Sequence, residues 1–126
     1  MDDERAHQVP GFDPDWRAAL LAAWRGAAET PIVDGGVYWQ TQGPRLETPA
    51  EICLIAEHAH VIGMTIASEC LVARELGLAY AAVCVVDNLA NGVEGRRLTV
   101  EELFAGRAAN REALRRALVA TVRELA

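Results

Sequence analysis

The sequence predicts an α/β fold built on a small sheet of about three strands. Short β-branched or apolar runs alternate along the chain with segments of helical period, which is typical of α/β proteins. The longest run, residues 78–86, is apolar at nearly every position, as expected for a strand covered on both faces. Because four helices cannot cover every face and edge of such a sheet, we expect another chain to complete it.

Four segments carry helix signals. An Asp-Pro pair at residues 13–14 predicts a helix start, since Asp caps a helix and Pro suits its first turn. Residues 48–51 and 99–102 each form a capping box, which begins the second and the last helix. The third helix, over about 67–76, ends at Gly77, a natural residue to follow a helix C-terminus.

Polar residues follow each of the three expected strands, at 37–39, 61–65 and 78–86. Ligands of open α/β sheets bind beyond the C-terminal ends of strands. These ends bring a carboxylate, a thioether, a hydroxyl and an amide into one predicted pocket, from Glu47, Met64, Thr65 and Asn88. A carboxylate and an amide can together bind a planar heterocycle that carries donors and acceptors, and a thioether packs against a ring or sugar.

Composition narrows the class of protein. The chain has 126 residues and a net charge of −6, which argues against a nonspecific nucleic-acid or anionic-membrane binder. No apolar run is long enough to span a bilayer, and the charged N-terminus is not a signal peptide. Three widely spaced cysteines predict neither a disulfide framework nor a zinc site. We expect a cytoplasmic protein with core cysteines and no metal or cofactor, a tail over residues 1–12, and one folded unit over 13–126.

The motifs carry a family resemblance. Residues 43–48 (Gly-Pro-Arg-Leu-Glu-Thr), 50–51 (Ala-Glu), 63–65 (Gly-Met-Thr) and the apolar run that ends in Asp87-Asn88 stand in an ordered, correctly spaced series. Over 13–126 the chain resembles the C-terminal half of the trimeric purine nucleoside phosphorylase and methylthioadenosine phosphorylase family. The N-terminal half of that family, with its phosphate-binding loop, has no counterpart in this sequence.

The resemblance implies a role for each motif residue. Glu47 and Asn88 would be catalytic: Glu47 would accept a hydrogen bond from N1–H of a 6-oxopurine, and Asn88 would bond the departing base. Thr65 would bind phosphate, the co-substrate. The remaining substrate-binding residues would be Leu46 against the base, Met64 under the ribose, Asp87 beside Asn88, and Val100 near the 5′ position. An apolar Val100 suits a 5′-methylthio or 5′-deoxy group, and the pairing of Glu47 with Asn88 resembles the oxopurine-selective branch.

Each of these side chains also has a simpler interpretation. Glu47 can be a solvated carboxylate near a helix N-terminus, Asn88 a turn residue, Met64 core filler and Thr65 a helix cap. Arg96 and Arg97 can be solvated, or can meet a phosphate or a partner. His60 and Ser68 depart from the family pattern, in which Asp and Pro are usual.

Three hypotheses follow. In the first, the chain is the nucleoside-binding subunit or half-domain of a phosphorylase. It is then completed by a second chain that carries the phosphate-binding half, by assembly into a trimer-type homo-oligomer, or by both. Alternatively, it is a non-catalytic purine-binding or assembly module derived from that family, or a truncated fragment. Because most of the phosphate clamp is absent, we expect no catalysis by this chain alone.

Overall fold

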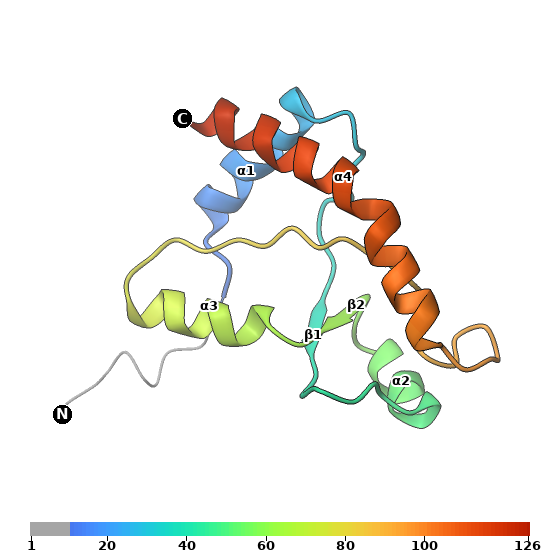
Figure 1. Cartoon of the computed structure of the whole chain (residues 1–126). Helices are drawn as coiled ribbons and strands as arrows, with labels where there is room; N and C mark the ends of the chain where they lie inside the picture. The colour runs from blue at the N-terminus through green and yellow to red at the C-terminus, as the bar shows by residue number, and fades with distance from the viewer. Residues whose placement is uncertain (1–10) are drawn as a thin grey trace, which may run out of the picture.

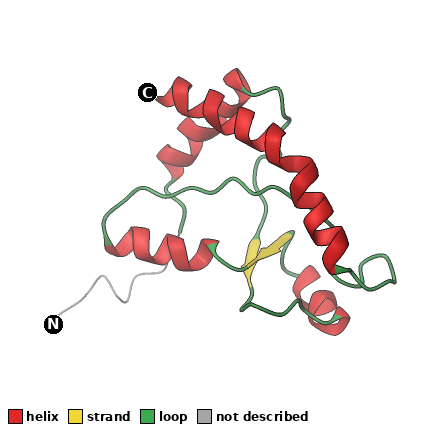
Figure 2. Ribbon diagram, viewed as in Figure 1, coloured by secondary structure: helices red, strands yellow, loops and turns green. Residues whose placement is uncertain are grey.

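The computed structural model describes residues 11–126 and shows helices around a two-stranded parallel sheet (Figures 1 and 2). The elements follow in the order α1 (Pro14–Ala27), β1 (Tyr38–Gln40), α2 (Pro49–Ala56), β2 (Val61–Gly63), α3 (Ile66–Glu75) and α4 (Val100–Leu125). Strands β1 and β2 pair in parallel with Tyr38 opposite Val61, so α2 is the crossover helix between them. The α/β class with a small sheet flanked by helices is therefore confirmed.

The expected helix starts are present. The Asp13 side chain accepts a hydrogen bond from the backbone N–H of Trp16 at 2.7 Å, and Pro14 is the first residue of α1. Thr48 and Thr99 form complete capping boxes with Glu51 and Glu102 at the starts of α2 and α4. These helix termini agree with the sequence because capping is local chemistry between residues three positions apart.

The third expected strand is not formed. Residues 78–86 run as extended chain between α3 and α4, across the middle of the molecule in Figure 2, without joining the sheet. A strand exists only when a neighbour pairs with its backbone, and β1 and β2 pair with each other instead. The sheet therefore has two strands, and the prediction of a third strand over residues 78–86 was wrong.

The main helix contact buries small residues around one aromatic side chain. Helix α1 packs against α4, where Ala23, Trp24, Ala117 and Thr121 are buried. Trp24 is only 3% exposed, and its indole N–H donates to the backbone oxygen of Thr30 at 2.8 Å. This contact holds the two ends of the described chain together.

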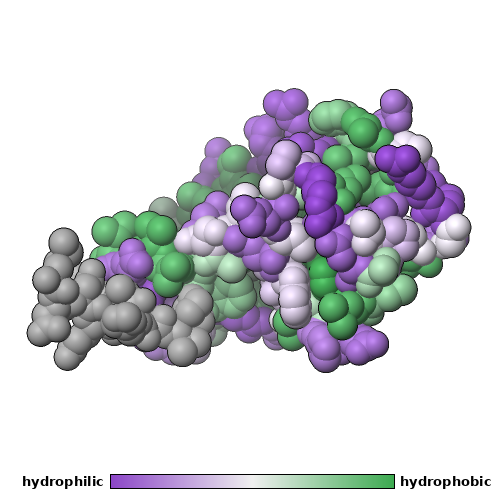
Figure 3. Space-filling model, turned by 90° about the horizontal axis from the view of Figure 1, so that it is seen from below, coloured by the Kyte–Doolittle hydropathy of each residue, from purple (hydrophilic) through white to green (hydrophobic). Residues whose placement is uncertain are grey.

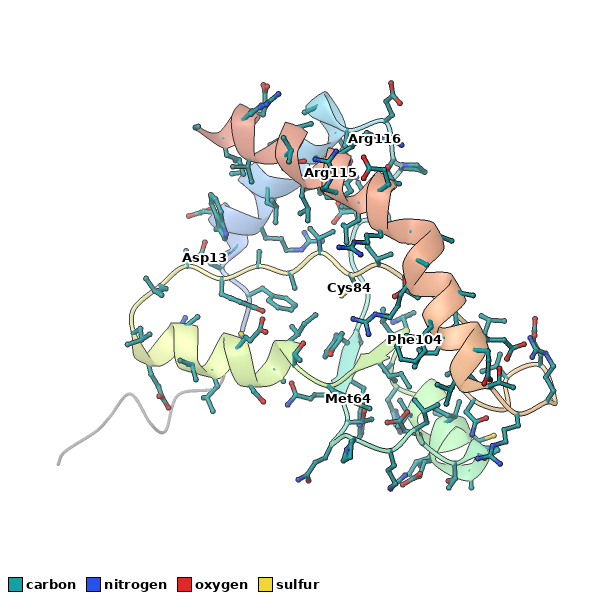
Figure 4. The ribbon with its side chains drawn as sticks, viewed as in Figure 1. Asp13, Met64, Cys84, Phe104, Arg115 and Arg116 are labelled. Carbon is teal, nitrogen blue, oxygen red and sulfur yellow. The ribbon has the colours of Figure 1, made fainter. Side chains whose placement is uncertain are left out.

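The cysteines follow the prediction in part. Cys70 is buried in α3, but Cys53 and Cys84 are exposed, so the expectation of three core cysteines was wrong for these two. Cys53 belongs to α2, and Cys84 lies on the unpaired 78–86 segment (Figure 4). The expected tail over residues 1–12 falls, for residues 1–10, outside the part of the chain that the structure describes.

Candidate functional site

A cleft of about 740 Å³ separates the loop at the start of α2 from the loop that precedes α4. Its two sides come from residues 44–49 and from residues 91–100, which are distant in the sequence. Gly92 lets these loops approach closely, because a Cβ there would lie only 2.8 Å from the Cβ of Pro49. Its φ of 87° is also a backbone conformation that favours glycine over other residues. Three predicted substrate-binding residues, Leu46, Glu47 and Val100, line this cleft.

Glu47 is the notable polar group of the cleft. The residue is 7% exposed, and none of the described residues donates a hydrogen bond to its carboxylate. Leucine, proline and valine side chains form much of the surrounding wall. Solvent still reaches its carboxylate oxygens, which can accept a hydrogen bond from a ligand that offers an N–H donor. The residue as a whole is more enclosed than the simpler interpretation of a solvated carboxylate expects.

Asn91 connects the two sides of the cleft. Its Nδ2 donates to the backbone oxygen of Glu47 at 2.9 Å, and its Oδ1 accepts from the backbone N–H of Leu98 at 3.0 Å. Both hydrogen bonds are partly buried. Sequence reasoning placed Asn91 only within a polar loop and gave it no role; its position before Gly92 was the one available signal.

The arginines of the cleft differ in their partners. Arg45 makes a bidentate pair with Glu51, at 2.9 and 2.7 Å, and this pair with the Thr48 contacts lowers the pKa of Glu51 to about 2. Arg96 is held by Glu94 and Glu102. Arg97 makes no ion pair with any residue from 11 to 126. Two of the three positive charges are therefore already matched by carboxylates.

Asp87 and Asn88 line a second, adjoining cavity of about 360 Å³ that shares Arg96 and Leu98 with the first. Asp87 accepts a hydrogen bond from Nδ2 of Asn110 in α4 at 2.8 Å. The Asn88 side chain donates to the neighbouring backbone oxygen of Leu89 at 2.8 Å, as the simpler turn interpretation predicts. The structure thus places Asn88 beside the cleft of Glu47 and not in it.

Met64 and Thr65 line neither cavity. Met64 is 38% exposed and its sulfur lies close to Gly43, beside the end of β1 in Figure 4. Thr65 is the N-cap residue of α3, but its side chain makes no capping hydrogen bond. The predicted pocket therefore divides into a cleft with Glu47, a neighbouring cavity with Asn88, and these two separate residues.

A family model described as the phosphorylase superfamily matches residues 3–123. The chain belongs to the phosphorylase superfamily. It is 46% identical over 102 residues to a probable 6-oxopurine nucleoside phosphorylase of Archaeoglobus fulgidus. The aligned region covers 81% of this chain and 42% of that relative.

Other relatives are similar to this chain over a comparable part of their length. It is 44% identical to a probable S-methyl-5′-thioinosine phosphorylase of Methanopyrus kandleri over 74% of this chain and 36% of that relative. It is 41% identical to the 6-oxopurine nucleoside phosphorylase of Pyrococcus furiosus over 73% of this chain and 35% of that relative. The chain thus spans about two fifths of the length of the curated relatives that it matches. No helix among the described residues is long and apolar enough to cross a membrane.

Proposed function

We propose that this superfamily member is the nucleoside-binding part of a purine nucleoside phosphorylase that prefers 6-oxopurine bases. The observation that carries the proposal is the largely enclosed Glu47, whose carboxylate accepts no hydrogen bond from residues 11–126 and lines a cleft of about 740 Å³. The N1–H of a 6-oxopurine supplies such a donor, whereas an aminopurine presents a lone pair at that position. The names of the relatives, which refer to 6-oxopurine and methylthioinosine substrates, support the same base class.

The reaction would exchange the base for inorganic phosphate at C1′ of the sugar, without a further cofactor. The C1′–N9 bond breaks, a C1′–O bond to phosphate forms, and the purine leaves with a proton. Protein groups assist by stabilising the charge that develops on the base and on the sugar. Glu47 would hold the base, and Asn88 would bond it as it departs. Val100, which lines the cleft, would favour a 5′-methylthio or 5′-deoxy group.

For Glu47 and Asn88 to act on one base, the 87–90 segment must move toward the cleft of Glu47. Asn88 would exchange its local bond to Leu89 for a bond to the base. The bridge from Asn91 to Glu47 already joins the two segments near this point. We propose further that Asp87 supports the Asn88 loop, and that Leu46 and Met64 contact base and ribose.

The phosphate site would be completed by a second chain. The Thr65 hydroxyl makes no capping hydrogen bond and would bind phosphate, but Arg45 and Arg96 are paired with carboxylates. We therefore expect turnover only in a complex. That complex would contain a second chain with the phosphate-binding half, or be a trimer-type assembly, or both. The reaction would belong to purine salvage in the cytoplasm. A non-catalytic purine-binding module is the second candidate, favoured by the separation of Thr65 from both cavities.

Calorimetric titration with inosine, methylthioinosine and adenosine tests the base assignment. Loss of a hydrogen bond to a charged group costs about 1.5–3 kcal/mol, so Glu47→Gln weakens inosine binding by roughly 10- to 150-fold. The matched control is Glu57→Gln, on an exposed residue at the end of α2, which leaves the affinity unchanged. Equal inosine affinity of wild type and Glu47→Gln, or tighter binding of adenosine, contradicts the proposal. Binding without phosphorolysis in any assembled complex favours the non-catalytic module.

A further inference from the structure

Asn110 of α4 holds the residue that directly precedes Asn88. Its Nδ2 donates to Oδ1 of Asp87 at 2.8 Å, in a partly buried hydrogen bond between residues 23 positions apart. The same nitrogen lies 3.4 Å from the backbone oxygen of Val86, a longer and weaker hydrogen bond. One side-chain amide of the last helix therefore holds the chain where the extended segment of residues 78–86 ends and the loop of Asn88 begins.

Gly106 gives the same helix a second contact with Asp87. It lies four positions before Asn110, and residues with this spacing share one face of a helix. A Cβ at position 106 would overlap the backbone oxygen of Asp87, so the absence of a side chain lets this part of the chain lie against α4. Helix α4 thus holds Asp87 at two points, by its backbone at Gly106 and by its carboxylate at Asn110.

The chain that follows Asn88 is held at its other end. Asn91 donates to the backbone oxygen of Glu47 and accepts from the N–H of Leu98. Residues 88–90, which line the cavity of about 360 Å³, therefore lie between two held residues. Three residues span at most about 10 Å, so the direction of the Asn88 amide depends on how the residue before it is held.

Exposure does not distinguish this segment from the rest of the surface. Leu89 is 53% exposed, but the green areas of Figure 3 show that apolar patches interrupt the polar surface of the molecule in several places. Exposed apolar side chains are ordinary on protein surfaces. The two held ends are the distinctive feature, together with the Asn88 side chain, which donates to the backbone oxygen of Leu89 in a local bond that a base can replace.

We propose that Asn110 is a positioning residue for Asn88. Its bond to Asp87 keeps the start of the loop on α4, so the loop turns about this end when Asn88 moves from Leu89 to the base. Asn110 lines neither cavity, so it acts through Asp87 and does not touch the nucleoside. The inference rests on the proposed function, which gives Asn88 its contact with the base.

Calorimetric titration of the full chain with inosine tests the inference. Asn110→Ala leaves the Asp87 carboxylate without this partner, so the loop loses more conformational freedom when Asn88 meets the base. We expect the inosine affinity to fall about 3- to 10-fold, which is the effect of one hydrogen bond. Arg107→Ala is the control on the same helix, because Arg107 is exposed and lines neither cavity and both residues favour a helix. The control should leave the affinity unchanged.

A double-mutant cycle separates positioning from a general structural effect. If Asn110 acts through Asn88, Asn110→Ala causes no further loss of inosine affinity in a chain that already carries Asn88→Ala. A general loss of packing would instead add to the loss that Asn88→Ala causes, because it does not depend on the Asn88 side chain.

A charge variant and its rescue decide the question if Asn110→Ala does not fold. Asn110→Asp sets two carboxylates against each other, so it should weaken inosine binding at least as much as Asn110→Ala does. Addition of Asp87→Asn restores a donor and an acceptor between the two positions, and the double variant should regain most of the affinity. Circular dichroism checks that each variant has the helix content of wild type.

Three results overturn the inference alone. They are a folded Asn110→Ala variant that binds inosine within about twofold of wild type, losses that add in the cycle with Asn88→Ala, and a charge variant that Asp87→Asn does not rescue. In each case Glu47→Gln and Asn88→Ala still weaken inosine binding, so the proposed function stands. A wild-type chain that does not bind inosine, or an Asn88→Ala variant that binds it as wild type does, overturns the proposed role of Asn88 and the inference with it.

Discussion

Removal of the Asn91 side chain is expected to destabilise the protein and loosen the cleft. Asn91→Ala removes two partly buried hydrogen bonds, one to the backbone oxygen of Glu47 and one from the N–H of Leu98. Each bond contributes about 1–1.5 kcal/mol, and its loss leaves a backbone group without a partner. The free energy of unfolding should therefore fall by about 2–3 kcal/mol, which corresponds to a decrease in Tm of roughly 6–12 °C for a chain of this size.

A series of variants checks that magnitude. Asn91→Asp keeps the acceptor for Leu98 but loses the donor to Glu47, so it should show about half the destabilisation. Asn88→Ala is the comparison for stability, since its side chain makes only one local bond to Leu89, and we expect a change below about 1 kcal/mol. Urea denaturation measures all three, and calorimetry should show weaker inosine binding for Asn91→Ala. An Asn91→Ala variant within about 0.5 kcal/mol of wild type would refute the bridge.

Two further predictions concern the loops around the cavities. Gly106→Ala would normally stabilise α4 by about 1 kcal/mol, but its Cβ would overlap the backbone oxygen of Asp87, so a net loss of about 1–3 kcal/mol is expected. In the control Gly26→Ala, in α1, the new Cβ has nothing within 4 Å, and the free energy of unfolding should rise by up to about 1 kcal/mol. If urea denaturation shows that both variants change stability in the same direction, the Asp87 contact is contradicted. The second prediction is that NMR titration finds a pKa of about 2 for Glu51 and a higher pKa in Arg45→Ala. Because this pKa lies below the usual glutamate value of 4.5, the stabilisation is present above pH 4.5 and lost as pH falls toward 2. An unchanged pKa in Arg45→Ala would refute the pairing.

Local chemistry accounts for what could be predicted about the helices. The capping boxes at Thr48 and Thr99 and the Pro14 start were readable because the interacting groups lie within three residues of one another. Gly77 follows α3 in the left-handed region, with a φ of 69°, as its place in the sequence predicts. The prediction for residues 78–86 was correct for an extended segment and wrong for a strand, because pairing needs a neighbour and no described residue pairs with residues 81–85.

The sequence names the residues of the candidate site one by one, and the structure distributes them over two cavities and a third place. The motif led to Glu47, but neither its burial nor its lack of a donor is visible in a sequence, since both depend on the closure of residues 91–100 over it. Asn91 was missed because its two partners, Glu47 and Leu98, are backbone groups without a sequence pattern.

The sequence by itself determined the family, the α/β class, the helix starts and the chemical types of the site residues. These depend on short-range capping, on apolar periodicity and on ordered motifs. Only the tertiary structure decided that Glu47 and Asn88 lie in adjoining cavities, that Thr65 stands apart, and that residues 81–85 have no strand partner within residues 11–126. The physical reason is that burial and backbone pairing are set by contacts between segments far apart in the chain, which no local pattern records.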